Sequence, residues 1–289
     1  MTNTQSSTPS NSNEKFTCLS SFFPSSPMVV TVFIGTFSVM FVGMGSLIIK
    51  EEGEFSLIGV ALTWGAVVAA NIYAVGHICG AHINPAVTFS LAVVRQFPWK
   101  HVPLYILAEL LGSLMASTML QWLFDGKDLH ILLTLPVGPN PASDLKVITI
   151  EAVFTFIYVF TSCGSRSDPR AHKNLGGVAV GASVFFAAIV AGNVTGASLN
   201  PARSLGPAIV IGNFNKIWIY ILSSTIGSLG ATMLYFLHLM PKNFDEQNDL
   251  KTEISDVYTR YNSTNPFFST DKQHSKNSIY LEDISIEMV

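Results

Sequence analysis

The sequence predicts an all-α membrane protein in which six transmembrane helices and two re-entrant half-helices form an inverted repeat. Three observations support this fold class. Of the 289 residues, 49% are hydrophobic and only 12% are charged, about half the charged fraction of a typical soluble domain. Six apolar stretches approach the length of about 20 residues that a spanning helix requires. The two halves of the chain also resemble each other in sequence.

The chain divides into an apolar middle and two polar tails. Residues 1–27 are rich in Ser, Thr and Asn and lack the features of a cleaved signal peptide, so we expect a disordered tail. A membrane domain follows over residues 28–240, with one repeat at about 28–124 and the other at about 147–240, and residues 241–289 form a polar C-terminal tail. The predicted spans are residues 28–49, 55–76, 102–124, 147–163, 175–192 and 217–239.

The charges and the cysteines exclude several classes of function. The net charge of −3 says little about partners, because many charges lie beyond about residue 243, and we expect no nucleic-acid partner. Cys18, Cys79 and Cys163 lie in different segments without the spacing of a metal or redox site. We therefore expect no metal, no cofactor and no disulfide framework.

Two further apolar segments, residues 83–94 and 199–212, are too short to cross a bilayer, and both open on Asn-Pro-Ala. Segments of about a dozen apolar residues are more often buried or re-entrant. They belong to an internal repeat, because GAHINPAVT at 80–88 matches GASLNPARS at 196–204, and VFIGTFSVMF at 32–41 matches EAVFTFIYVF at 151–160. Three full spans in each half is an odd number, so the second half must enter the membrane from the opposite side. The two half-helices are then expected to meet near the middle of the membrane.

The order of residues in each Asn-Pro-Ala motif predicts the start of a helix. Asn84 and Asn200 suit the N-cap, and Pro85 and Pro201 suit the first helical turn, where no backbone N–H is missed. Ala86 and Ala202 complete the motifs. Each half-helix would bring a positive dipole end and unpaired N–H groups to the membrane midplane, and irregular backbone at that depth must be buried in protein or line a watery cavity.

A single Asn-Pro-Ala would indicate only a helix start in a loop, but two copies in matched positions indicate a shared function. The asparagine amides and the positive helix ends predict a passage that attracts the oxygen of a neutral solute and repels cations. Arg203 follows the second motif, where the first has Val87. Because an arginine at membrane depth costs at least about 2.5–3.5 kcal/mol, we interpret Arg203 as a pore-lining filter residue; a snorkelling structural arginine is the alternative.

Two carboxylates within the predicted spans need a partner. Glu151 could accept hydrogen bonds from backbone N–H groups of the second re-entrant loop. Glu109 could support the first loop in the same way, or carry a proton in a transporter, although the sequence shows no histidine or second acid in line with it. His77 and His82 flank the first loop and are interpreted as hydrogen-bonded loop residues; a proton relay or metal ligands are the alternatives.

These residues resemble the aquaporins, or major intrinsic proteins, over about residues 28–240. Within that family, TWGAVVAANIYAVGHICGAHINPAVT, RQFPWKHVPLYI and NVTGASLNPARSLGPAIV are similar to the plant nodulin-26-like intrinsic proteins. The resemblance implies six tilted helices with two half-helices, a pore in each subunit and a homotetramer. It also implies a multi-pass protein of the plasma membrane with both termini cytoplasmic, which agrees with a slight excess of Lys and Arg in the inner loops.

The resemblance also supplies an outer constriction, formed by Trp64, Ala188, Ala197 and Arg203. Water-selective members have a histidine at the position of Ala188, so its loss predicts a wider and less hydrophilic opening. A lipid-facing Trp64 is the alternative interpretation of that residue. The family usually has a glutamate at the position of Val32, so another side chain or water must accept from the first re-entrant loop here.

We therefore predict a passive channel, not an enzyme, for small uncharged solutes and water. Glycerol and metalloid hydroxides such as boric acid or arsenite are the expected solutes, and hydrogen peroxide is a further candidate. The alternatives are a water-selective channel, a secondary transporter coupled to protons through Glu109 or Glu151, and a non-conducting scaffold. In the C-terminal tail, Ser275 and Ser278 lie in KQHSKNS, a candidate phosphorylation segment; an unregulated tail is the alternative.

Overall fold

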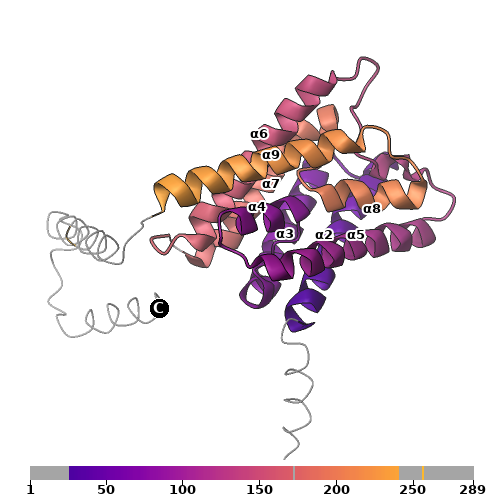
Figure 1. Cartoon of the computed structure of the whole chain (residues 1–289). Coiled ribbons are helices and arrows are strands. Elements are labelled where there is room, and N and C mark those ends of the chain that lie inside the picture. Colours follow the sequence, from indigo (N-terminus) through magenta and orange to yellow (C-terminus); the bar gives the residue numbers. More distant parts are fainter. Residues whose placement is uncertain (1–25, 172, 241–255, 257–289) are drawn as a thin grey trace, which may run out of the picture.

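The computed structural model describes residues 26–171, 173–240 and 256 (Figure 1). The candidate phosphorylation sites Ser275 and Ser278 therefore lie outside the described residues, as does nearly all of the predicted C-terminal tail. The first helix begins at Ser26, so only residues 1–25 of the predicted N-terminal tail lie outside them.

Six long helices and two short ones make up the described fold, which confirms the predicted fold class. The long helices are α2 (Ser26–Glu51), α3 (Leu57–Cys79), α5 (Val102–Leu123), α6 (Asp144–Ser162), α7 (Gly176–Thr195) and α9 (Ile217–Leu234). Helices α6 and α9 continue as π-helical turns, η3 (Cys163–Ser167) and η5 (Tyr235–Leu239). The half-helices are α4 (Pro85–Val93) and α8 (Pro201–Ile211), and short 3-10 turns are η1 (Trp99–His101), η2 (Leu129–Leu132) and η4 (Lys173–Leu175).

The fourth and fifth spans are longer than the sequence predicted. Helix α6 begins at Asp144, three residues before the expected start at 147, and α7 runs to Thr195 instead of residue 192. The prediction stopped at polar residues such as Asp144, Lys146 and Asn193, but an acidic residue in a first helical turn is favourable. The left-handed Gly196 (φ 89°) ends α7.

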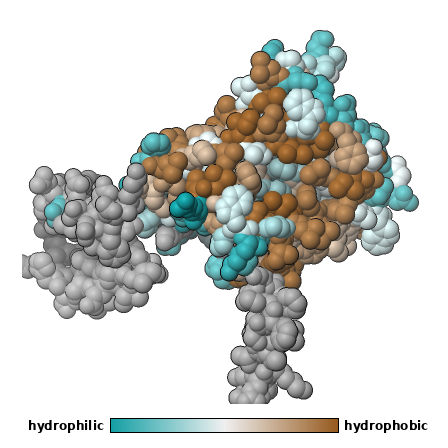
Figure 2. All heavy atoms as spheres, viewed as in Figure 1, coloured by the Kyte–Doolittle hydropathy of each residue, from teal (hydrophilic) through white to brown (hydrophobic). Residues whose placement is uncertain are grey.

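The outer surface of this bundle is apolar. Within the described ranges, six helices are long and apolar enough to cross a membrane, and large side chains such as Leu107, Trp122, Phe186 and Val190 are exposed on them. Figure 2 shows hydrophobic residues over most of the visible face, with hydrophilic residues gathered toward its ends. This distribution matches a surface that faces lipid hydrocarbon.

The packing of the helices follows the internal repeat. The half-helix of each sequence half packs against the last span of the other half, α4 against α9 and α8 against α5. Helices α3 and α7 cross at Gly65 and Gly181, where the two backbones are in contact. A Cβ on Gly65 would lie 2.7 Å from the carbonyl oxygen of Gly181. Only glycine allows this close approach of two backbones.

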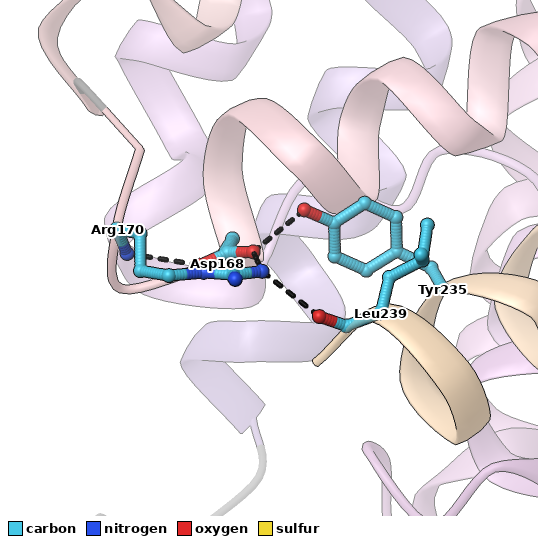
Figure 3. Close-up of polar contacts among 4 residues, drawn as sticks. All are labelled: Asp168, Arg170, Tyr235 and Leu239. Atoms are coloured by element: carbon cyan, nitrogen blue, oxygen red, sulfur yellow. Dashed lines mark hydrogen bonds and ion pairs between the residues drawn. The ribbon is translucent and has the colours of Figure 1, made fainter. Parts of the chain in front are cut away.

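The segment that joins α6 to α7 is bound to the end of the last span (Figure 3). Asp168 accepts hydrogen bonds from Nε of Arg170 (2.9 Å) and from the hydroxyl of Tyr235 (2.7 Å), and Arg170 also donates to the carbonyl of Leu239 (2.9 Å). Burial opposes ionisation of Asp168, but the hydrogen bonds from Arg170 and Tyr235 outweigh it and lower the pKa of this carboxyl to about 2. The cluster therefore ties the α6–α7 connection to η5.

Candidate functional site

Each half-helix starts at the asparagine of its Asn-Pro-Ala motif. Asn84 and Asn200 have extended backbone (φ −157° and −153°), and their side-chain oxygens accept from the N–H of Ala86 (3.0 Å) and Ala202 (2.9 Å). A proline follows as the first helical residue in both. The N-cap and proline positions are those that the motif order predicts.

The loops that lead into the half-helices have the same unusual backbone. Four non-glycine residues adopt positive φ, and they occupy equivalent positions in the two repeats: Ala81 (43°), Ile83 (52°), Ala197 (45°) and Leu199 (55°). Such conformations cost of order 1–3 kcal/mol each and persist only where the surroundings hold them. Each loop therefore needs strong contacts to the helices around it.

The two loops hold each other through their asparagines. The amide Nδ2 of Asn84 donates to the carbonyl of Leu199 (2.9 Å), and Nδ2 of Asn200 donates to the carbonyl of Ile83 (2.7 Å). The sequence predicted that both amides donate to a solute, and this stays a prediction. One hydrogen of each amide binds the opposite loop, so each asparagine keeps one N–H for a ligand.

Glu151 on α6 binds the second re-entrant loop. Its Oε1 accepts from the hydroxyl of Thr195 (2.6 Å) and from the N–H of Ser198 (3.0 Å), and its Oε2 accepts from the N–H of Leu199 (2.9 Å). The carboxylate is fully buried. These are the contacts expected of a buried acid that supports a loop.

Glu109 on α5 binds the first re-entrant loop. Its Oε1 accepts from the N–H of Asn84 (3.0 Å) and the hydroxyl of Thr88 (2.8 Å), and Nδ1 of His82 lies 3.1 Å from the same hydroxyl. The sequence showed no histidine in line with Glu109, and this was wrong, because Thr88 connects the two. His77, by contrast, is exposed on α3.

Arg203 is held on two sides. It is the third residue of α8 and only 2% exposed, and its Nη1 donates to the carbonyl of Leu132 in η2 (2.5 Å). Its guanidinium carbon lies 5.4 Å from the ring centroid of Trp64, within the range of a cation–π contact. Within the described part of the chain, its Nε has no hydrogen-bond partner.

One cavity of about 250 Å³ brings the predicted residues together. Trp64, Ala188, Ala197 and Arg203 line it, together with Asn84 and Asn200. Trp64 therefore faces the interior of the bundle, and the lipid-facing alternative does not apply. The remaining predicted residues are placed elsewhere: Pro85, Ala86 and Pro201 border a separate apolar groove, and Ala202 is buried.

Several residues of the site were missed from the sequence. Gly43 on α2 makes room for Trp64, because a Cβ there would lie 2.6 Å from the indole ring. The hydroxyls of Ser113 and Ser228 bind the half-helix carbonyls of Ala202 (2.6 Å) and Ala86 (3.1 Å). A signal for the serines existed, since YILAELLGSL at 105–114 repeats as YILSSTIGSL at 220–229.

Arg166, one of the Lys and Arg residues of the predicted inner loops, was also missed as a residue of the site. It lies in η3, at the end of α6, and its Nη2 donates to the carbonyl of Gly80 at 2.7 Å. The residue ties η3 to the start of the first re-entrant loop.

Comparisons with known proteins agree with this geometry. The family model described as Major intrinsic protein matches residues 22–235. Aquaporin NIP1-1 of Zea mays is 41% identical over 211 residues, which cover 72% of this chain and 73% of that protein. Nodulin-26 of Glycine max is 41% identical over 204 residues, or 70% of this chain and 74% of that protein. The solved structure of the aquaglyceroporin from Plasmodium falciparum superposes with a TM-score of 0.68 at 25% identity and covers 74% of this chain and 96% of that one.

Proposed function

The chain belongs to the major intrinsic protein family of membrane channels, and on this premise we propose that it passively conducts small uncharged solutes larger than water. Glycerol and the metalloid hydroxides boric acid and arsenite are the proposed solutes, with hydrogen peroxide and water as further permeants. We further propose that the protein is a homotetramer of the plasma membrane with both termini cytoplasmic.

The observation that carries the proposal is the composition of the cavity wall around Arg203. The guanidinium offers donors to a solute hydroxyl, while Trp64, Ala188 and Ala197 line the same cavity with an indole and two methyl groups. A polyol or B(OH)3 has oxygens that accept from such donors and can turn a less polar surface to the indole. The small Ala188 leaves room that a larger side chain would fill. This wall supports amphipathic solutes over strict selection of water.

Exclusion of ions is the second part of the proposal. Arg203 and the N-terminal ends of α4 and α8 would all oppose the entry of a cation into the cavity. The free N–H of Asn84 and of Asn200 would bind the oxygen of a neutral solute instead. Conduction would then follow the solute gradient alone.

The alternatives of another class have less support. A proton-coupled transporter could use Glu109, Thr88 and His82, but neither Glu109 nor Thr88 lines the cavity, and the ring of His82 packs against Phe97 and Tyr105. A non-conducting scaffold was favoured only by Val32, which removes the usual acceptor of the first loop. Because Glu109 accepts from that loop, this argument is weaker.

The test is stopped-flow light scattering on vesicles that contain the purified protein, with water, glycerol and boric acid compared. We expect glycerol and boric acid to enter at least tenfold faster than in protein-free vesicles, with no change when a proton gradient is collapsed. Ala188→His should reduce glycerol entry at least tenfold while water flow continues. Val190→Phe, which adds bulk on the exposed side of the same helix, is the control and should conduct normally.

Three results would contradict the proposal. Fast water flow with both solutes excluded would indicate a water-selective channel. Solute entry that depends on the proton gradient would indicate a coupled transporter. Vesicles that swell no faster than protein-free controls for every solute would favour the scaffold.

A further inference from the structure

The two re-entrant loops are held by carboxylates from helices that are not related by the internal repeat. Glu151, which binds the second loop, lies on α6, and its counterpart in the first repeat is Val32 on α2. Glu109, which binds the first loop, lies on α5, and its counterpart in the second repeat is Ser224 on α9. Among the described residues, the hydroxyl of Ser224 binds the carbonyl of Tyr220 in its own helix and no carboxylate or loop N–H. Each repeat therefore has one loop-binding carboxylate, but the two carboxylates occupy positions that are not equivalent.

Positions 32 and 109 lie on two neighbouring helices, α2 and α5, at the same level along the helix axes. A Cβ on Gly112 of α5 would meet the carbonyl of Phe33 on α2 at 2.7 Å, and one on Gly45 of α2 would meet Leu120 of α5 at 3.5 Å. The residue numbers increase together along both helices, so α2 and α5 run parallel. Glu109, one turn before Gly112, therefore lies beside the turn of α2 that contains Val32, which is fully buried.

We propose that the loop-holding acceptor of the first repeat has moved from position 32 on α2 to Glu109 on α5, and that Glu109 thereby positions Asn84 in the pore. The contact differs from that of Glu151, which binds the N–H groups of Ser198 and Leu199, the two residues before the second asparagine. Glu109 binds the N–H of the pore asparagine itself. A displacement of Glu109 would therefore move Asn84 directly.

A short chain of hydrogen bonds extends this contact into the loop. The hydroxyl of Thr88 donates to Glu109 (2.8 Å), and Nδ1 of His82 lies 3.1 Å from the same hydroxyl, which can accept from the Nδ1–H tautomer of His82. Thr88 is in the first turn of α4 and His82 is in the loop before it. The single oxygen Oε1 of Glu109 thus organises the loop on both sides of Asn84. Its other oxygen, Oε2, has no hydrogen-bond partner within the described residues.

Because Oε1 accepts both hydrogen bonds and Oε2 accepts none, substitutions that keep or remove a single acceptor oxygen at position 109 test the proposal. Glu109→Gln keeps a carbonyl oxygen that can accept from Asn84 and Thr88, with its NH2 group at the site of Oε2. Glu109→Leu has a similar size but no acceptor, so it leaves the N–H of Asn84 without its acceptor in the protein interior. The Thr88 hydroxyl can then turn to Nδ1 of His82. Val32→Glu combined with Glu109→Leu returns a carboxylate to the position that matches Glu151. Ser224→Ala, the repeat-related change on α9, is the matched control.

The experiment measures two quantities for each variant: water and glycerol permeability per inserted copy, and hydrogen exchange of the amides around Asn84. We expect Glu109→Leu to lower both permeabilities at least tenfold and to accelerate exchange at Asn84 at least tenfold. Glu109→Gln should retain at least half of the normal permeability, and the Val32→Glu/Glu109→Leu double variant should recover at least a third of it. Ser224→Ala should match the unmodified protein. If Glu109→Leu fails to insert, recovery of inserted protein by the double variant is the equivalent result.

Two outcomes would overturn the proposal: normal permeability and exchange in Glu109→Leu, or a double variant that recovers neither permeability, exchange protection nor insertion. The permeability readout rests on the proposed channel function, whereas the exchange readout does not. A protein that conducts nothing but shows the predicted exchange pattern would refute the channel proposal and leave the role of Glu109 standing.

Discussion

Gly43→Ala offers a sharp test of the filter, because the three atoms nearest to the added methyl group all belong to Trp64. The ideal Cβ on Gly43 lies 2.6 Å from three atoms of the indole ring, whereas carbon atoms in contact are normally about 3.5–4.0 Å apart. The ring must therefore move by about 1 Å, away from α2. Trp64 lines the cavity and lies 5.4 Å from Arg203, so the displaced ring would narrow the opening beside the guanidinium.

We expect Gly43→Ala to reduce the entry of large solutes more than the flow of water. Overpacking of this kind costs about 1–3 kcal/mol, and the exchange of glycine for alanine in a helix returns about 1 kcal/mol, so the variant should still fold. We expect glycerol entry to fall at least fivefold and water flow to fall less than twofold, measured by stopped-flow light scattering on the same vesicles.

Gly45→Ala is the matched control for this experiment. It lies two residues further along α2 and has the same gain in helix propensity, but its Cβ would meet only Leu120 at an ordinary 3.5 Å. Equal glycerol entry in the two variants would refute the reasoning, because it would mean that Trp64 does not border the constriction.

Three further predictions test other contacts of the fold and the pore. Arg203→Val removes the donor to Leu132 and the cation in the cavity, so cation or proton leakage, measured by pH-sensitive dye in vesicles, should rise severalfold; unchanged leakage would exclude a filter role. Glu151→Leu leaves the buried N–H groups of Ser198 and Leu199 unpaired at about 1–3 kcal/mol each, whereas the Thr195 hydroxyl can still donate to the carbonyl of Ala191. The variant should lower the thermal unfolding temperature in detergent by at least 5 °C; a smaller shift would mean that the loop finds other acceptors. The lowered pKa of Asp168, about 2 against an ordinary 3.8, is worth about 2 kcal/mol of stability above pH 4 that is lost as pH falls from 4 to 2. Asp168→Asn should be less stable at neutral pH and should lack this acid-dependent loss, as thermal unfolding at stepped pH would show.

The sequence alone was sufficient for the architecture. The spans can be predicted from the length and composition of the apolar segments. A segment in lipid hydrocarbon must pair its own backbone N–H groups, and an α-helix does this within one segment. The half-helices follow from Asn-Pro-Ala, since an N-cap followed by proline has a local meaning wherever it occurs. The inverted repeat follows from the odd number of spans in each half. All of these can be recognised without knowing which helices pack against each other.

The contacts of the site depended on tertiary structure instead. Sequence alone could not tell that each asparagine amide gives one hydrogen to the opposite loop, because Asn84 and Leu199 are far apart in the chain. Nor could it tell that Trp64 faces the cavity, that Leu132 accepts from Arg203, or that Glu109 reaches Asn84. The physical reason is the same in each case. A buried polar group must find a partner somewhere, but which partner it finds is set by how the helices cross, and that is decided only when both halves of the chain have packed together.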